Sequence, residues 1–489
     1  MKLSKILTGI DYEILCGNDD IIIDELAYDS RRVKENSLFI ALVGFNSDGH
    51  DYINQAIDKG ATAILCERDI QVSREITVVK VNNTRDIFSR VCSNYFDNPE
   101  KDLTLIGITG TKGKTTTSFM IKKVLECASL KVGVIGTTGT YYLDKYYSNA
   151  NTTPESYELY KYMREIVDND IKYLIMEVSS QALKVGRVKE LNFDYAIFTN
   201  LTLDHVGKNE HETFLEYVYC KSLLFKQSRI GILNIDDEHY KDMIKDSSCL
   251  VYSYGLSNEA NLRCDKIEYL HNNDFLGIKI DMKGLVNDSF LVNMPGKFSA
   301  YNAMAAISLG KLLNIKIDSI KEGLLEFRVR GRMERVDVSD KFSVFIDYAH
   351  NGVSMESILS TVKEYKPKRI VSLFGCGGNR SRDRRYDMGE ISGKYADLSV
   401  ITSDNSRYET FEDIAKDILV GMQKTSGEYI VIPDRREAIK YCIENGREGD
   451  VILILGKGHE DYQEINGIKY PFDERVVIKD ILEELNEEI

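Results

Sequence analysis

The segment GITGTKGKTTT at residues 107–117 constrains the fold of this chain more than any other. It follows an apolar run at 103–106 and precedes apolar residues at helical spacing up to residue 125. A strand, a glycine turn and a helix in this order direct backbone N–H groups and a helix N-terminus at one point, where polyphosphates bind. In such loops Lys114 reaches the terminal phosphates and Thr115 ligates Mg²⁺. The segment therefore predicts an ATP site, although Ile108 occupies the position of the usual first glycine.

The nucleotide is expected to contact a continuous part of this loop. The residues predicted to do so are Gly110, Thr111, Lys112, Gly113, Lys114, Thr115 and Thr116. The alternative is an ordinary strand–helix connection with glycines needed only for the turn. Such a turn does not need the lysine and the run of threonines, so we favour phosphate binding.

The length and the repeated pattern of the sequence predict a multidomain α/β protein. With 489 residues the chain is too long for one ordinary core, and about 150 residues per domain suggests about three domains. Strand-like apolar runs alternate with amphipathic runs throughout, which is typical of parallel α/β architecture. The polar segment 97–100 contains a proline and is predicted to be a linker, and the pattern restarts after residue 334.

Composition excludes several classes of function. The formal net charge of −14 disfavours nucleic acid as a partner, although the basic cluster at 380–385 could bind anionic groups. The nine cysteines form no C-x-x-C pair, so neither a zinc site nor a disulfide framework is predicted. No segment is long and apolar enough to insert into a membrane, and acidic residues interrupt the N-terminus too early for a signal peptide. We therefore expect a cytoplasmic protein with mostly buried thiols.

Polar residues at the ends of two apolar runs suggest a metal site beside the phosphate loop. Glu177 closes the run at 173–178, and His205 lies just beyond the run at 195–199. Parallel sheets bind ligands at the carboxyl ends of their strands, so both side chains are predicted to converge on Thr115. Considered singly, Glu177 could be a strand-end charge and His205 a hydrogen-bonded loop residue. Their shared location favours metal ligation.

Further motifs, taken in order, resemble one family along the whole chain. They are TGTKGKTTT at 109–117, NTTPES at 151–156, MEVSSQAL at 176–183, LDH at 203–205 with Lys221 downstream, GKFSAYNAMAA at 296–306, GRMERV at 331–336, DYAHN at 347–351 and ILGKGHE at 454–460. Together they resemble the Mur ligases of peptidoglycan synthesis, and among these the MurE type, which adds the third residue of the stem peptide. The resemblance implies a three-domain architecture, with a central P-loop-type parallel sheet and a C-terminal Rossmann-like domain. The expected domains are a UDP-sugar-binding domain at 1–100, a central ATP-binding domain at 101–327 and an amino-acid-binding domain at 328–489.

The resemblance also implies a reaction. The carboxylate of UDP-MurNAc-L-Ala-D-Glu would attack the γ-phosphate of ATP, and an unprotonated amine of a diamino acid would then displace phosphate from the acyl phosphate. Lys114 and Mg²⁺ would serve the first step. In the family a lysine is carbamylated to become a metal ligand, and Lys221 occupies the matching position. From spacing alone Lys221 would be a surface helix lysine. The implied catalytic set is Lys114, Glu177, His205 and Lys221, with Thr115, Glu177, His205 and carbamylated Lys221 as metal ligands, in a monomer.

Substrate-binding residues follow from the same resemblance. Ser30, in a segment YDSRRV at 28–33, is expected to contact the UDP end, with DGH at 48–50 in the same block. The residues expected to hold the muramoyl dipeptide are Asn151, Thr152, Thr153, Ser179 and Arg187. Those expected at the adenine, ribose and phosphates of ATP are Asn302, Arg332, Asp347 and His350. Those expected at the incoming amino acid are Arg380, Asp404, Asn405, Ser406, Arg407, Gly456 and Glu460.

The identity of the amino acid is open between two candidates. Ligases for meso-diaminopimelate carry Asp-Asn-Pro-Arg, whose arginine pairs with the distal carboxylate, and lysine ligases lack that arginine. Arg407 favours diaminopimelate, because a guanidinium left unpaired rejects a substrate without the carboxylate. Ser406 replaces the proline, so Arg407 could instead turn toward Glu409. Two features leave L-lysine as the alternative. The spacing from the LDH motif to Lys221 is long, and Gln181 stands where many relatives have histidine.

Two other classes of function compete with this interpretation. A folate-glutamylating ligase of the same superfamily is disfavoured by the DSR and DGH segments of the first block. A non-catalytic paralogue that binds muramoyl peptides is disfavoured by the intact Lys114, Thr115, Glu177, His205 and Lys221.

Overall fold

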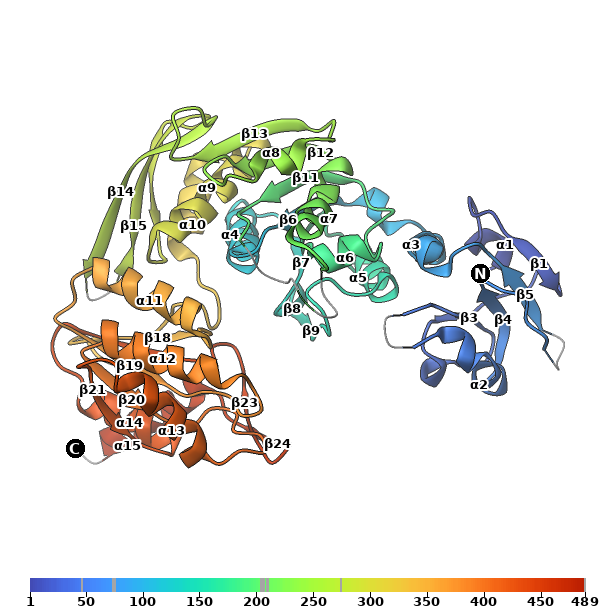
Figure 1. Cartoon of the computed structure of the whole chain (residues 1–489). Coiled ribbons are helices and arrows are strands. Elements are labelled where there is room, and N and C mark those ends of the chain that lie inside the picture. The colour runs from blue at the N-terminus through green and yellow to red at the C-terminus, as the bar shows by residue number, and fades with distance from the viewer. Residues whose placement is uncertain (45–46, 73–75, 203–206, 208–210, 273–274, 488–489) are drawn as a thin grey trace. The chain divides into compact units, whose positions relative to one another are not determined.

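The computed structural model describes residues 1–489 except 45–46, 73–75, 203–206, 208–210, 273–274 and 488–489 (Figure 1). The chain divides into two compact units, which are described separately below. The first unit comprises Met1–Arg263 and Met304–Ile320, and the second comprises Cys264–Ala303 and Lys321–Ile489. The chain enters the second unit within strand β14 (Leu262–Asn272) and passes through both along helix α9 (Lys297–Leu312).

The first unit begins with a five-stranded sheet in the order β1-β5-β4-β3-β2, in which only β1 is antiparallel to its neighbour. Its elements are α1 (Leu3–Ile6), β1 (Glu13–Cys16), β2 (Glu25–Ala27), β3 (Ser37–Ile40), α2 (Ile53–Asp58), β4 (Ala61–Cys66), β5 (Thr77–Lys80) and α3 (Thr84–Tyr95). All four residues of β3 are buried. Burial on both faces is typical of a parallel strand covered by helices.

A parallel sheet in the order β13-β12-β11-β6-β10-β7 carries the phosphate loop in the first unit. Its elements are β6 (Thr104–Thr109), α4 (Lys114–Cys127), β7 (Val132–Gly136), α5 (Ser156–Asp168), β10 (Tyr173–Glu177), α6 (Ser180–Lys184), β11 (Phe193–Phe198), α7 (Phe214–Lys226), β12 (Ser228–Asn234), α8 (Tyr240–Ile244) and β13 (Leu250–Gly255). Antiparallel strands β8 (Gly139–Tyr142) and β9 (Lys145–Tyr147) follow β7 at the edge. Because β6 lies between β10 and β11, the loops after these three strands end at one edge of the sheet.

The predicted strands at 173–178, 195–199 and 230–234 correspond to β10, β11 and β12. Helix α4 begins at Lys114, as expected, because Gly113 adopts a left-handed conformation with φ of 84° that suits the residue before a helix. The segment 97–100, predicted to be a linker, follows α3, which ends at Tyr95, and includes the start of a short 3₁₀ turn at Pro99–Asp102 that leads into β6. As a domain boundary it stays a prediction.

The second unit contains a six-stranded sheet in the order β17-β18-β22-β19-β20-β21, parallel except for β17. Its elements are β15 (Phe275–Gly284), β16 (Asp288–Val292), α10 (Ile317–Glu326, which starts in the first unit), β17 (Glu334–Val336), β18 (Ser343–Asp347), α11 (Gly352–Glu364), β19 (Arg369–Phe374), α12 (Arg382–Tyr395), β20 (Leu398–Ile401), α13 (Phe411–Met422), β21 (Glu428–Val431), α14 (Arg435–Glu444), β22 (Asp450–Leu455), β23 (Tyr462–Ile465), β24 (Ile468–Pro471) and α15 (Glu474–Glu487). The expected runs at 342–347, 369–374, 398–402 and 450–455 form β18, β19, β20 and β22. Part of the loop predicted at 271–274 lies outside the described residues.

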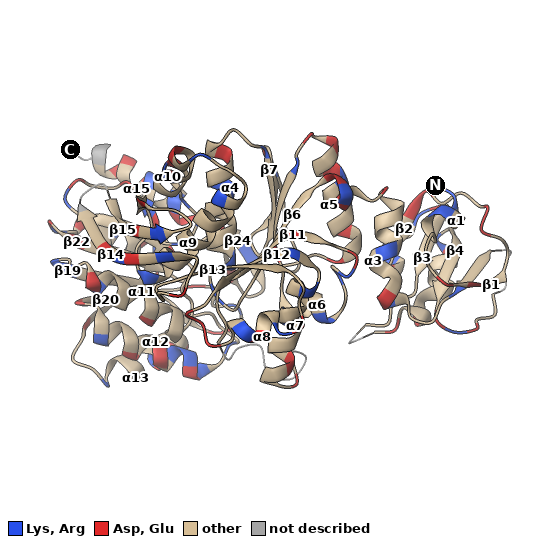
Figure 2. Ribbon diagram, turned by 90° about the horizontal axis from the view of Figure 1, so that it is seen from above, with Lys and Arg blue, Asp and Glu red and all other residues tan. Residues whose placement is uncertain are grey.

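Charged residues of both signs are spread over each unit (Figure 2), and the cysteines carry free thiols. Figure 2 shows basic and acidic residues interleaved on the elements of each unit. Within the basic cluster at 380–385, Arg382 and Arg385 donate to Asp417, and Arg385 also donates to Glu409, so these guanidinium groups are neutralised. All nine cysteines are free thiols, and six of them are buried. Among the described residues, no helix is both long and apolar enough to span a membrane.

Candidate functional site

The phosphate loop joins β6 to α4 and places two lysines at one carbonyl. Lys114 Nζ donates to the Gly110 carbonyl at 2.7 Å and to the Thr111 carbonyl at 3.2 Å. Lys221 Nζ, from α7, donates to the same Gly110 carbonyl at 3.0 Å. Lys221 is 2% exposed, so it is not a surface lysine, and its ammonium also lies over the Tyr217 ring. Two ammonium groups beside a helix N-terminus form a site for a strongly anionic group.

The loop backbone is partly held by its neighbours. The N–H groups of Thr111 and Lys112 donate to the backbone and side-chain oxygens of Asn200, which follows β11. Gly110 has a φ of 147°, and a Cβ there would lie 2.0 Å from Thr199 Oγ1. Lys114, Thr115 and Thr116 form the first turn of α4. The backbone N–H groups of a first helical turn have no acceptor within the helix, so they can bind an anion.

Glu177 lies at the centre of a buried oxygen cluster beside this loop. Its carboxylate accepts hydrogen bonds from Thr115 Oγ1 at 3.0 Å, from Thr137 Oγ1 at 3.0 Å and from the Thr137 N–H at 3.1 Å. Glu177 is fully buried at the end of β10, next to β6 in the sheet. A carboxylate and a hydroxyl are the oxygen ligands that Mg²⁺ prefers, so this donor set fits the predicted metal. His205, its predicted partner, lies outside the described residues.

Gly136 provides a test of this cluster, because an added Cβ would lie 2.2 Å from Glu177 Oε1. We expect Gly136→Ala to push the carboxylate away from Thr115 and to lower kcat by roughly 10-fold or more, since small displacements of catalytic groups have large effects. The measurement is ATP-dependent turnover together with the thermal unfolding midpoint. Gly133→Ala, on the same strand, would meet the flexible end of Ile166 and is the matched control. Equal activity losses in the two variants would contradict the prediction.

The residues expected to hold the dipeptide gather next to Glu177. Thr153 Oγ1 donates to the Glu177 carbonyl at 2.9 Å and accepts from the Ser179 N–H at 3.0 Å. Arg187 Nη1 donates to the Thr153 carbonyl at 3.0 Å, and the Arg187 guanidinium also pairs with Glu155. In addition, the hydroxyls of Thr152 and Thr137 share a hydrogen bond of 3.0 Å. Asn151, at the start of this segment, is exposed.

Ser30 lies apart from this cluster, in the N-terminal sheet region. It opens a 3₁₀ turn at Ser30–Arg32 that Asp29 caps, and Ser30 Oγ donates to Gln55 Oε1 at 2.7 Å. The nearby Tyr28 hydroxyl and Arg32 both donate to Glu158 on α5. The structure thus joins Thr152, Thr153, Ser179 and Arg187 in one cluster with Glu177, whereas Ser30 is buried in the N-terminal sheet region.

In the second unit, three of the four residues predicted at the nucleotide form a cluster after β18. Asp347 is buried and accepts from the N–H groups of Met333 and Ala349, and its burial raises the pKa of its carboxyl. The Arg332 guanidinium lies over the Tyr348 ring, and the His350 ring contacts the same tyrosine in a tilted arrangement with ring centroids 4.6 Å apart. Cations and aromatic rings of this kind suit a purine and its phosphates. Asn302 is buried on α9.

His459 belongs to the same aromatic cluster and gives a pH prediction. Its ring contacts Tyr348 with centroids 4.7 Å apart, and burial, helped by the charges of Arg332, Arg330 and Arg475, lowers its pKa to about 4 from 6.5. The unfolded chain therefore binds a proton between pH 6.5 and 4 that the folded chain rejects. Stability is retained above pH 6.5 and falls as the pH drops toward 4.

We expect His459→Asn to reduce the proton uptake on unfolding by up to about one proton over this pH range. The measurement is the free energy of unfolding by urea at several pH values. His239→Asn, a half-buried histidine of the first unit, is the control. An unchanged slope in His459→Asn would contradict the assignment.

The loop after β20 and the loop after β22 meet at the predicted amino-acid site. Asn405 Nδ2 donates to Glu460 Oε2 at 2.9 Å, and buried Lys457 donates to Asn405 Oδ1 at 3.1 Å and to Glu460 at 3.3 Å. Gly456, with φ of 116°, approaches Asp404 so closely that a Cβ would lie 2.6 Å from Asp404 Oδ2. Arg407 is half-buried in the same loop.

One alternative for this loop has a clear outcome. Arg407 does not turn toward Glu409: it pairs with Glu464, and Glu409 pairs with Arg385. Arg380 is exposed at the loop after β19, and Ser406 is half-buried.

Sequence reasoning missed several residues of these clusters. They are Thr137, Glu155, Lys457 and Glu464. Thr137 directly follows the apolar run at 132–136, so the strand-end argument used for Glu177 could have found it. Glu155 and Lys457 lie inside motifs already singled out, whereas nothing in the sequence marks Glu464.

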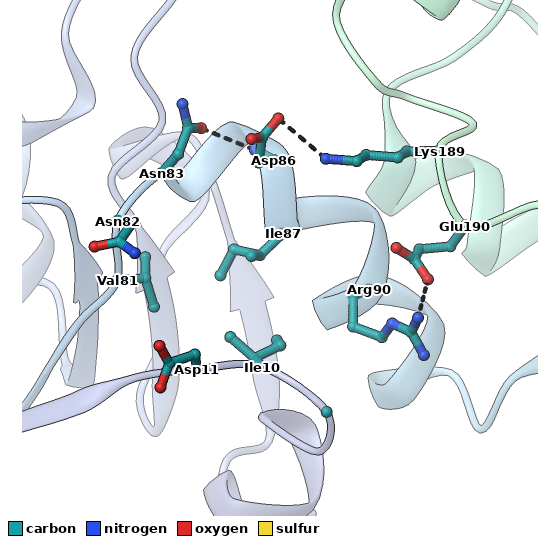
Figure 3. Close-up of a pocket in the computed structure, with 11 residues that line it drawn as sticks. Ile10, Asp11, Val81, Asn82, Asn83, Asp86, Ile87, Arg90, Lys189 and Glu190 are labelled. Atoms are coloured by element: carbon teal, nitrogen blue, oxygen red, sulfur yellow. Dashed lines mark hydrogen bonds and ion pairs between the residues drawn. The ribbon is translucent and has the colours of Figure 1, made fainter. Parts of the chain in front are cut away.

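A separate pocket of about 330 Å³ lies in the first unit (Figure 3). Its lining, which includes Asp11, Asn82 and Asn83, contains none of the predicted site residues. Four of its charged side chains pair with one another, Asp86 with Lys189 and Arg90 with Glu190, as the dashed lines show. We therefore place the functional site at the phosphate loop rather than in this pocket.

Comparison with known proteins decides the family. A curated protein of Caldanaerobacter subterraneus subsp. tengcongensis, named UDP-N-acetylmuramoyl-L-alanyl-D-glutamate–2,6-diaminopimelate ligase, is 41% identical over 99% of both chains. The chain belongs to the Mur ligase family. A protein of Clostridium acetobutylicum with the same name, numbered 1, is 40% identical over 99% of this Mur ligase and 100% of its own length.

Family models match three consecutive parts of this Mur ligase. The Mur ligase family catalytic domain matches residues 22–101, the Mur ligase middle domain matches 108–310, and the Mur ligase glutamate ligase domain matches 331–458. A solved structure titled as a UDP-N-acetylmuramoyl-L-alanyl-D-glutamate–2,6-diaminopimelate ligase covers 99% of both chains with a TM-score of 0.74 and 26% identity. MurF from Acinetobacter baumannii, at 16% identity and a TM-score of 0.65, shares the fold. The expected three-domain Mur ligase architecture is confirmed, while the boundaries at 100 and 327 stay predictions.

Proposed function

We propose that this Mur ligase adds meso-2,6-diaminopimelate to UDP-MurNAc-L-Ala-D-Glu, with ATP as the energy source. The observation that carries the proposal is the position of Lys114, Lys221, Thr115 and buried Glu177 around one phosphate loop. The names of its relatives support the choice of substrates, since the proteins of Caldanaerobacter and Clostridium at about 40% identity are named as diaminopimelate ligases.

The first step is phosphoryl transfer to the substrate carboxylate. Lys114 neutralises the terminal phosphates, and the N-terminus of α4 stabilises the charge that develops on them. Thr153, Ser179 and Arg187 hold the dipeptide so that its terminal carboxylate faces the γ-phosphate. That carboxylate oxygen forms a bond to phosphorus as the bond to ADP breaks, which yields an acyl phosphate.

Thr115 and Glu177 would hold Mg²⁺, which would supply positive charge to neutralise the phosphates. Glu177 keeps its carboxylate aligned through Thr115 and Thr137. We propose that Lys221, once carbamylated, and His205 complete the set of metal ligands.

The second step joins the amine to the acyl group. The unprotonated amine of the diamino acid attacks the acyl carbon, phosphate leaves, and an amide forms. Arg407 pairs with the distal carboxylate, while Asn405 and Glu460 hold the amino acid near the loop after β22. The residues proposed to bind the nucleotide are Asn302, Arg332, Asp347 and His350.

We also propose that the enzyme works as a cytoplasmic monomer. Size-exclusion chromatography with light scattering tests the oligomeric state.

The experiment is phosphate release from Mg²⁺-ATP and UDP-MurNAc-L-Ala-D-Glu with meso-diaminopimelate, with L-lysine or without an amino acid, with the product mass checked. We expect turnover with diaminopimelate only. Turnover with lysine would assign the enzyme to the lysine branch. If neither diamino acid supports turnover but ATP releases phosphate in the presence of a folate and glutamate, the enzyme is a folate ligase. If no substrate supports phosphate release, the protein is a binding paralogue.

A further inference from the structure

The hairpin of β23 and β24 is hydrogen-bonded to the loop that carries Arg407. The Arg407 N–H donates to the Glu464 carbonyl at 3.0 Å, and the Asn466 N–H donates to the Arg407 carbonyl at 2.6 Å. On the same strand, the Glu464 N–H donates to Asn405 Oδ1 at 2.9 Å, and Gln463 Nε2 donates to Ser403 Oγ at 2.8 Å. Two of these hydrogen bonds hold the loop backbone at Arg407, and the other two hold the side chains of Asn405 and Ser403.

These bonds explain how the loop keeps its shape without a proline. Arg407 has a φ of 51°, a left-handed conformation that costs free energy for a residue with a Cβ. Ser406 leaves the preceding backbone unrestricted. The contact with β23 supplies the restraint instead, and Gly378 permits the close packing, since a Cβ there would lie 1.8 Å from the Ser406 carbonyl oxygen.

The guanidinium of Arg407 is also hydrogen-bonded to its neighbours. Nε donates to Glu464 Oε2 at 3.3 Å, and Nη1 donates to the Gly378 carbonyl at 2.7 Å. Among the described residues, these two contacts use Nε and Nη1, which leaves Nη2 to meet a ligand. The side chains of Arg407 and Glu464 are 22% and 21% exposed, so the pair is partly shielded from water yet open to a small molecule.

We propose that Glu464 is a positioning residue for amino-acid specificity: its carboxylate orients the Arg407 guanidinium toward the distal carboxylate of the substrate. The inference depends on the proposed function and deepens it. A free arginine side chain samples many rotamers, and ordering it on binding costs affinity. Because Glu464 and Gly378 order it beforehand, the substrate carboxylate meets a guanidinium already in place.

The test compares Glu464→Gln with the parent enzyme by steady-state kinetics. We expect the KM for meso-diaminopimelate to rise roughly fivefold, the effect of losing a partly exposed charged contact. We expect kcat and the KM for ATP to stay within about twofold, because the side-chain contact described for Glu464 is with Arg407 in the proposed amino-acid site. Glu428→Gln makes the same chemical change at an exposed site of β21 and is the matched control.

A double-mutant cycle separates positioning from a structural role. If Glu464 acts through Arg407, then Glu464→Gln has no further effect on the diaminopimelate KM in an Arg407→Ala background. A KM unchanged in the single variant, or raised equally in both backgrounds, would overturn the inference. A parent enzyme that forms no diaminopimelate product would overturn the proposed function and this inference with it. A productive parent with an unaffected Glu464→Gln would overturn this inference alone.

Discussion

Replacing Glu177 with glutamine is expected to lower kcat by roughly 10²- to 10³-fold, the size of effect seen when one preorganised electrostatic group is removed. Glutamine keeps the shape, and its one oxygen can still accept from the hydroxyls of Thr115 and Thr137, but it lacks the charge that holds a divalent cation. Its amide nitrogen cannot accept from the Thr137 N–H, so the free energy of unfolding should fall by about 1–2 kcal/mol, the effect of one lost buried hydrogen bond. The measurement is single-turnover phosphate release at several Mg²⁺ concentrations.

Glu165→Gln is the control for this variant. Glu165 accepts from the Tyr147 hydroxyl in the same unit and is not part of the cluster around the phosphate loop. Retention of more than about a tenth of the parent kcat in Glu177→Gln would show that another group holds the cation, since loss of a metal-binding carboxylate is expected to cost more than that.

Arg407→Lys is expected to lower kcat/KM for meso-diaminopimelate by roughly 10²-fold while the KM for ATP stays constant. A lysine ammonium cannot make both contacts that the guanidinium makes, to Glu464 and to the Gly378 carbonyl, and still present a planar pair of donors to a carboxylate. The measurement is the ratio of kcat/KM values for diaminopimelate and L-lysine, which should shift toward lysine.

Arg436→Lys provides the matched control, because Arg436 pairs with Glu484 on the surface of the same unit. A diaminopimelate kcat/KM within about threefold of the parent would argue that Arg407 does not contact the substrate, since the loss of a bidentate pair costs far more.

Much of the phosphate site was predictable because it depends on local sequence. A strand, two glycines with positive φ and a helix start are encoded within the segment from β6 to α4, and strand-end position alone brought Glu177 to Thr115. The burial of Lys221 was not predictable from spacing. The helix that carries it is apolar on more than one side, so periodicity could not say which face meets the loop.

The sequence by itself determined the family, the α/β class, the order of the strands along the chain and the chemistry at the phosphate loop. Only the tertiary structure decided which polar groups meet across elements: Thr137 at Glu177, Lys457 at Asn405, and Glu464 rather than Glu409 at Arg407. The physical reason is that each of these contacts joins residues far apart in sequence. Local propensities fix where a strand ends, whereas the packing of loops from different strands fixes which side chains come within hydrogen-bonding distance.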